Sequence, residues 1–236
     1  MPVPLIVGAA LVLAVVVYYG LARRWMLTWG TKRSERRAAL PGDDFVVAPR
    51  TTSTRAITVR APAELVWPWV AQMGQGRGGL YSYDRLENFF GGDVHSVDRV
   101  IAELQDVAVG DTIRLAREGY PANIAFAFKV AFVHPPRVLV LHSPGTREEC
   151  FAAGLPFTTW AFVVERVDER TSRLISRWRT DFKPSFKGYF WWQWGPMDLV
   201  EFVMERKMLK GIRTRAEHEV VRTALRAGSA QSDRTH

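Results

Sequence analysis

The sequence lacks most features that would mark a nucleophilic or metal-dependent enzyme. It has one cysteine, Cys150, so no internal disulfide can form, and a lone thiol suits a reducing compartment. The five histidines show no metal-ligand spacing, and no G-x-S-x-G motif is present. We therefore expect no metal and no cofactor, and the sequence identifies no catalytic residue.

Charge is absent from the beginning of the chain. No charged side chain occurs from Val3 to Ala22, and the chain becomes basic immediately afterwards. A helix of this length is roughly 30 Å long, the thickness of a bilayer's hydrocarbon core. No basic residue precedes the run, and bulky Trp25 and Met26 follow it, unlike a signal peptide with its cleavage site. We expect residues 1–24 to be a retained transmembrane helix, and a cleaved signal peptide is the alternative.

The basic residues predict an orientation in the membrane. The net charge is +8, and residues 23–37 alone carry six basic side chains against Glu35. The positive-inside bias predicts a single-pass protein of the cell membrane, with the N-terminus outside and the C-terminal domain in the cytoplasm. Charge concentrated beside the membrane favours membrane lipids as partners, and we expect no nucleic acid.

Composition divides the rest of the chain into three parts. Residues 25–53 contain turn signals and no sustained apolar period, which predicts a basic juxtamembrane segment and tether. Residues 54–226 are long enough for one domain with a sizeable core. Residues 227–236 are small and polar, so we expect a disordered tail.

The domain's pattern predicts an α+β fold. A strand is expected over 55–60, a helix from Ala61-Pro62, and a short helix over 83–90. Alternating apolar residues then predict strands near 112–115, 125–133, 137–142, 158–167 and 172–182, joined by short turns as in an antiparallel meander. A long amphipathic helix is expected over about 197–224, with its apolar row running from Val200 through Met204 and Met208 to Val220.

Three stretches resemble a known superfamily. "RAITVRAPAELVWPWVAQMG" at 55–74 resembles the opening strand and helix of the SRPBCC superfamily, the START and Bet v 1-like proteins. "GQGRGGLYSYDRLENFFG" at 74–91 and "FVMERKMLKGI" at 202–212 are similar to its bacterial polyketide cyclase/dehydrase-like branch. The resemblance covers roughly 54–220 and leaves out the N-terminal helix. It implies a helix-grip fold, an antiparallel sheet wrapped on a long C-terminal helix, with a cavity between them. It does not select an activity.

The expected cavity is apolar and adaptable. Its strand faces are rich in aromatic residues, and the closing helix offers methionines, which adjust to varied apolar shapes. The expected ligand-binding residues are Trp67, Tyr81, Tyr83, Phe128, Trp160, Trp178, Met204 and Met208. The same residues could instead fill a solid core.

An aromatic segment precedes the final helix. Clustered Trp and Tyr beside Lys183 and Lys187 have the composition of an interfacial membrane anchor. The alternative is that this segment plugs the mouth of the cavity. The expected membrane-contact residues are Trp25, Trp29, Phe186, Tyr189, Phe190, Trp191, Trp192 and Trp194.

Together these features predict membrane-anchored binding, and possibly transfer, of a hydrophobic small molecule such as a lipid or isoprenoid-like compound. One alternative is a cyclase/dehydrase-type enzyme acting on an apolar substrate. Another is a non-catalytic accessory subunit of a membrane complex, which would have a membrane-protein partner. A deep apolar pocket favours the carrier, facing ionisable groups favour the enzyme, and a filled core favours the subunit.

Overall fold

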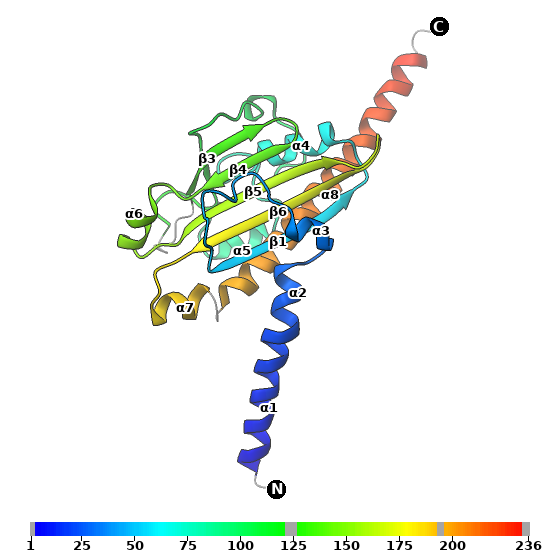
Figure 1. The fold of residues 1–236 in the computed structure, drawn as a ribbon. Helices are drawn as coiled ribbons and strands as arrows, with labels where there is room; N and C mark the ends of the chain where they lie inside the picture. Colours follow the sequence, from blue (N-terminus) through cyan, green and yellow to red (C-terminus); the bar gives the residue numbers. More distant parts are fainter. Residues whose placement is uncertain (1–2, 121–126, 193–195, 233–236) are drawn as a thin grey trace.

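The computed structural model describes residues 3–120, 127–192 and 196–232 (Figure 1). Its centre is a six-stranded antiparallel sheet with strand order β1-β6-β5-β4-β3-β2. The long C-terminal helix α8 (Pro196–Ser232) crosses behind this sheet. The predicted α+β class, with an antiparallel sheet on a long C-terminal helix, is therefore confirmed.

The sheet is a meander closed by its first strand. Strands β2 to β6 neighbour one another in sequence order, and β1 pairs with β6, Thr51 lying opposite Thr180 and Val59 opposite Ser172. The first strand begins earlier than its apolar alternation predicts. The strands are β1 (Thr51–Val59), β2 (Thr112–Arg114), β3 (Ala127–His134), β4 (Val138–His142), β5 (Phe157–Arg166) and β6 (Ser172–Asp181).

Short helices flank the sheet. Pro62 occupies the N-cap of α4, where its missing N–H needs no partner. The helices between strands are α4 (Ala63–Ala71), α5 (Asp84–Phe89), η2 (Ala102–Leu104) and α6 (Arg147–Ala152), and α7 (Phe186–Trp192) lies between β6 and α8. The N-terminal region forms α1 (Val3–Val17), the π-helical η1 (Tyr18–Ala22), α2 (Arg23–Leu27) and α3 (Arg33–Arg37).

The core lies between the sheet, α4 and α8. Five side chains at its centre are 0% exposed. They are Phe162 from β5, Leu174 from β6, Trp69 from α4, and Leu209 and Ile212 from α8. Burial of such side chains is worth about 1.5–3 kcal/mol each. The core therefore holds α8 firmly from its fourth turn onward.

The inward face of α8 differs from the predicted row at its beginning. Asp198, Phe202, Glu205 and Leu209 are buried there, whereas Val200 is 48% exposed. An i, i+4 row turns by about 40° per step around an α-helix, so it leaves one face after a few turns. The helix also continues to Ser232, so residues 227–232, expected to be disordered, are helical.

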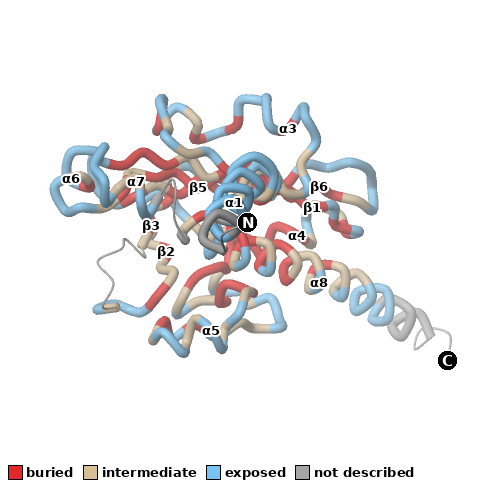
Figure 2. The backbone as a smooth tube through the Cα atoms, turned by 90° about the horizontal axis from the view of Figure 1, so that it is seen from below, coloured by how far each residue is buried: buried red, intermediate tan, exposed pale blue. Residues whose placement is uncertain are grey.

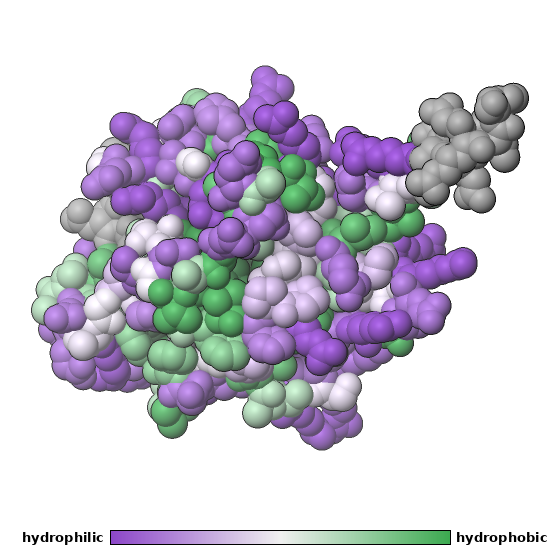
Figure 3. Space-filling view, turned by 90° about the horizontal axis from the view of Figure 1, so that it is seen from above, coloured by the Kyte–Doolittle hydropathy of each residue, from purple (hydrophilic) through white to green (hydrophobic). Residues whose placement is uncertain are grey.

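The N-terminal helices project away from the domain (Figure 1). By length and composition, the 21-residue stretch Val7–Leu27 can cross a bilayer. A signal sequence has the same position and character, so either reading fits this helix. In the view from below, α7 and α5 lie on different sides of α1 (Figure 2). The opposite end of the molecule is mostly hydrophilic, with an apolar area in its middle (Figure 3).

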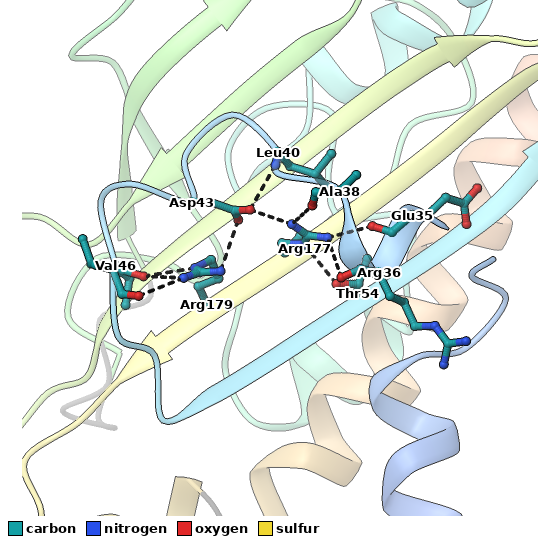
Figure 4. A network of polar contacts seen from close by, with 10 residues as sticks. Glu35, Arg36, Ala38, Leu40, Asp43, Val46, Thr54, Arg177 and Arg179 are labelled. Atoms are coloured by element: carbon teal, nitrogen blue, oxygen red, sulfur yellow. Dashed lines mark hydrogen bonds and ion pairs between the residues drawn. The ribbon is translucent and has the colours of Figure 1, made fainter. Parts of the chain in front are cut away.

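Residues 28–50, which we call the strap, lie across the outer face of the sheet. Arg177 of β6 donates to the carbonyl oxygens of Ala38 (2.9 Å) and Glu35 (2.8 Å) and to Asp43 Oδ2 (2.6 Å) (Figure 4). Arg179 donates to the Val46 carbonyl at 2.9 and 3.0 Å. The segment expected to be a tether is thus a packed layer in the structure.

A third arginine of β6, Arg173, also holds the strap. Arg173 forms a two-point contact with Glu35, 2.7 Å from Oε1 and 3.0 Å from Oε2, and also contacts the Gly30 carbonyl. Burial would raise the pKa of Glu35, but the hydrogen bonds from Arg173 and the Lys32 backbone, together with the charges of both residues, outweigh it and hold that pKa below its ordinary value. Leu40, 8% exposed, packs beside these contacts with Ala56 and Ile175. The strap therefore fixes the domain close to the end of the N-terminal helix.

Candidate ligand-binding site

A small hollow lies where the N-terminal helices meet the domain. Its volume is about 10 Å³, room for one water molecule. It lies at the end of the domain from which the N-terminal helix leaves (Figure 1). The described residues lining it are Leu27, Thr51, Ser53, Trp178, Thr180, Met197, Asp198 and Glu201.

Strand pairing and the helix start bring these residues together. Ser53 lies opposite Trp178, and Thr51 lies opposite Thr180, in the β1–β6 ladder. Alternate residues of a strand share one face, so these four side chains face the same way. Asp198 and the remaining α8 residues come from its first turns, above that face.

Aromatic rings fill the space behind the hollow. Trp178 stacks on Trp160, with ring centroids 4.3 Å apart and an interplanar angle of 24°. Phe128 meets both rings edge-on, at 5.6 and 6.2 Å. Trp160 Nε1 donates to Ser176 Oγ at 2.8 Å, so its polar atom is satisfied inside the core. The hollow thus has a polar rim and an aromatic floor.

Ion pairs join the N-terminal helices, the sheet and α8 beside the hollow. Arg23 Nε lies 2.5 Å from Asp198 Oδ2. Arg55, fully buried on β1, contacts Glu201 Oε1 at 2.7 Å and the carboxylate of Glu205. Its Nε also donates to the Met26 carbonyl at 2.9 Å. Arg55 therefore connects α2, β1 and α8 in one contact set.

The electrostatics of this set are unbalanced. Burial raises the pKa of Asp198 despite Arg23, and burial likewise raises the pKa of Glu205 despite Arg55. Burial would lower the pKa of Arg55, but the nearby Glu205 and Glu201 carboxylates raise it above its ordinary value. Three carboxylates thus share two guanidinium groups.

The N-terminal helix also packs on α8 through apolar contacts. The ring of Trp25 meets Phe202 edge-on at 5.0 Å, although Trp25 remains 55% exposed. Trp29 is half-buried against the core, and Arg206 lies 5.1 Å above its ring. Of the two tryptophans expected to contact lipid, Trp25 has the more accessible ring.

The expected cavity residues divide into two groups. Phe128, Trp160 and Trp178 meet behind the hollow, and Met208, 2% exposed, belongs to the same core cluster. Of the other four, Trp67 and Tyr81 are buried in the same core cluster but are not among the residues lining the hollow, Tyr83 is 43% exposed beneath Lys207, and Met204 approaches the Ser82 hydroxyl.

The expected membrane-contact residues of α7 are mostly exposed. Phe186 is 79%, Phe190 45% and Trp191 42% exposed, and α7 lies at the end of the domain from which α1 projects (Figures 1 and 2). Tyr189 is half-buried, with its ring 5.5 Å from Phe182 and its hydroxyl accepting from Arg50 at 3.0 Å. The side chain of Trp192 and all of Trp194 lie outside the described part of the chain.

The charged residues of the site were not among those expected from the sequence. Asp198, Glu201 and Glu205 recur at three- and four-residue spacing, which places them on one face of a helix. Arg55 has the strand parity of Ile57 and Val59, so a charge was visible on an otherwise buried face. Both signals are readable in the sequence.

Comparison with known proteins identifies a general fold likeness. No protein-family model and no curated protein sequence matches the chain. Among solved structures, the chain is similar to the Aha1 dimer from Colwellia psychrerythraea, with 15% identity over 71% of this chain and 96% of that one, and a TM-score of 0.41. It is similar to the Zhui aromatase/cyclase from Streptomyces sp. R1128, with 17% identity over 72% and 95% and a TM-score of 0.42.

Norcoclaurine synthase from Thalictrum flavum is similar at 14% identity over 78% of this chain and 94% of that chain, with a TM-score of 0.39. Identities this low carry nothing about activity, so function is argued from this chain's own residues.

Proposed function

We propose that the chain holds its domain at a membrane and binds the apolar part of an amphiphilic molecule between the sheet and α8. The observation that carries this proposal is the hollow beside α2, whose floor is the Trp178–Trp160 stack. A polar rim above an aromatic floor suits a molecule with a polar head and an apolar tail. A membrane lipid or isoprenoid-like compound has this character.

Binding a tail in this space requires the first turns of α8 to move. The hollow, of about 10 Å³, has room for one water-sized group, so an alkyl tail does not fit into it as it stands. The contacts to be released are Arg23 with Asp198 and Trp25 with Phe202. The same contacts link α8 to the N-terminal helix, so an amphiphile arriving from the adjacent leaflet meets the part of the domain that must open.

The proposal includes docking of α7 on the bilayer. Its exposed Phe186, Phe190 and Trp191 rings favour the headgroup region, and the exposed Lys183 and Lys187 can reach anionic lipid. The six basic residues between 23 and 37 favour the cytoplasmic side for the domain.

The test is to block the hollow from its rim. Thr51 lines the hollow at the start of β1, so Thr51→Trp should fill it and reduce binding of dodecanol at least about tenfold. Thr52→Trp is the matched control, because Thr52 is exposed and points to the other face of the strand. Native mass spectrometry of the detergent-extracted full chain measures occupancy. Equal binding by both variants, or none by the wild type, would reject the proposal.

The two carboxylates on the rim favour one alternative, a reaction on the bound molecule. A carboxyl with a raised pKa can serve as an acid, and burial raises the pKa of Asp198. Mass spectrometry of the bound compound before and after incubation distinguishes the two. A changed mass that Asp198→Asn prevents would establish the enzyme, and an unchanged mass favours the carrier.

A further inference from the structure

We infer that the hollow selects amphiphiles whose polar head is a small cationic amine. This inference rests on the proposed function, because it concerns the head of the molecule whose tail would lie beneath α8. It concerns the sign of the charge that the hollow accepts, which neither the fold nor the composition of the chain determines.

The rim itself presents negative charge. Among the described residues lining the hollow, the two charged ones are Asp198 and Glu201, and both are carboxylates. The remaining polar groups of the lining are the hydroxyls of Thr51, Ser53 and Thr180 and the indole N–H of Trp178. Hydroxyl and carboxylate oxygens both accept hydrogen bonds, and an ammonium group has only donors.

The guanidinium groups approach these carboxylates from outside the lining. Arg23 engages Oδ2 of Asp198, and Arg55 engages Oε1 of Glu201, an oxygen that also accepts from Ser53 at 2.7 Å. The contacts described therefore engage one oxygen of each rim carboxylate. The second oxygens are the natural acceptors for a cation in the hollow.

The residues directly behind the rim do not cancel this charge. Arg55 is 0% exposed and must also serve Glu205, whose side chain is 3% exposed and whose Oε1 has no hydrogen-bond partner among the described residues. Three carboxylates against two guanidinium groups leave one negative charge in excess when all are ionised. Burial is the main cause of the raised pKa values of Asp198 and Glu205, and the nearby Glu201 charge raises both further, so each carboxyl takes up a proton more readily than a free one. A bound cation would satisfy the site in place of that proton.

Size and surroundings agree with an ammonium group. The volume of about 10 Å³ suits one water-sized group, and a primary ammonium is of that size. The ring of Trp178 also lines the hollow, and indole attracts cations through its ring face. A carboxylate or phosphate head would instead lie beside Asp198 and Glu201 and be repelled.

A preference for a cationic head is the opposite of what the net charge of the chain predicts, so the two expectations can be told apart by experiment. A net charge of +8 favours anionic ligands at long range. The experiment compares dodecylamine, dodecanoate and dodecanol, which share one tail, on the full chain in an uncharged sugar detergent at neutral pH. Quenching of tryptophan emission and native mass spectrometry report occupancy. We expect dodecylamine to bind at least about tenfold more tightly than either of the others.

Variants of the rim locate the effect. Glu201→Gln and Asp198→Asn each remove one rim charge and should lower the amine-to-alcohol affinity ratio by about tenfold. Glu148→Gln is the matched control, because its side chain is 79% exposed on α6, outside the hollow. Circular dichroism of each variant establishes that the fold is retained.

Each outcome decides one of the two ideas. If dodecanol binds and dodecylamine shows no advantage, or dodecanoate binds as tightly, the inferred amine preference is overturned while the proposed function stands. If no probe binds, the proposed function fails and the inference fails with it. An amine advantage that Glu148→Gln abolishes as strongly as the rim variants would also overturn the inference.

Discussion

Arg55 is the residue on which the arrangement depends most. It lies on the inward face of β1, has no exposure, and contacts the Met26 carbonyl and the carboxylates of Glu201 and Glu205. A buried charge persists only where partners compensate its desolvation. The start of α8 and the end of α2 are thus positioned by one side chain.

Replacing Arg55 should lower the stability of the domain, and a second substitution at Glu205 should restore most of it. Arg55→Met leaves Glu205 buried without its cation, so we expect a loss of about 3–5 kcal/mol in the free energy of unfolding. Arg55→Met with Glu205→Met should recover most of this loss, because an apolar pair replaces the ion pair. Urea unfolding followed by circular dichroism measures both. A single variant that loses less than about 1 kcal/mol would show that the pair contributes little.

Glu87 on α5 should make stability depend on pH. Burial, together with the nearby Asp84 charge, raises its pKa to about 7. An acid whose pKa is higher in the folded than in the unfolded state binds more protons when folded, so stability falls as pH rises from about 4.5 to about 7. Glu87→Gln should reduce this fall by an amount of the order of 1 kcal/mol, after allowance for partial exposure. Thermal melts of both proteins at pH 5 and pH 8 measure this loss of stability. An equal loss in the wild type and in Glu87→Gln would show that Glu87 does not cause it.

Residue patterns predicted the apolar half of the site better than its ionic half. Alternation placed Phe128, Trp160 and Trp178 on inward strand faces, because a strand's two faces follow directly from sequence. The pairing of Arg55 with Glu205 joins residues 150 positions apart, and sequence spacing carries no information about such a contact. The charges were visible, but their meeting point was not.

At the scale of elements, the strap was the feature least accessible to sequence. Its apolar residues, such as Leu40 and Val46, follow no sustained period, so the sequence does not mark them as buried. Its partners are arginines on alternate positions of β6, which read in sequence as a solvated strand face. Strands β3 to β6 were predictable because their apolar alternation and short turns are local properties.

Arg177→Ala should release the strap. The change removes the donor to Asp43 and to the Glu35 and Ala38 carbonyls, so we expect a loss of about 2–3 kcal/mol in stability and cleavage within residues 28–47 by a broad-specificity protease. Arg36→Ala is the control, since its side chain is exposed. If both variants resist the protease equally with the wild type, the strap is held chiefly by its apolar contacts.

The α7 helix should bind bilayers through its exposed rings. Phe186→Ser with Trp191→Ser should change stability little, because both side chains are largely exposed, and should weaken binding to anionic vesicles by about tenfold or more. Co-sedimentation of a chain that begins at Arg23 measures the binding without the membrane span. Val167→Ser, an exposed residue just beyond β5, is the control. A large loss of stability with unchanged vesicle binding would show that these rings pack in the core and do not contact lipid.

On the scale of the whole molecule, the hollow, α7 and the start of α8 all lie at the end from which α1 projects (Figures 1 and 2). The strap and Arg55 tie the domain directly to the end of that helix, so the domain has one orientation relative to it. A ligand site at this end faces whatever the helix is embedded in. Under the proposed function, this arrangement suits exchange of the ligand with the adjacent leaflet.

The last prediction is that residues 3–22 stay in the mature protein as a membrane span. Loss of residues 1–24 would remove Arg23 from Asp198, which is 6% exposed, and would leave that carboxylate without its cation. We therefore expect carbonate-washed membranes to retain the full-length chain in the pellet, with an intact mass by mass spectrometry. Arg23→Ala should lower stability by about 1–3 kcal/mol for the same reason, whereas Arg24→Ala, an exposed neighbour, should not. A soluble chain beginning near residue 25 would instead identify the helix as a signal sequence.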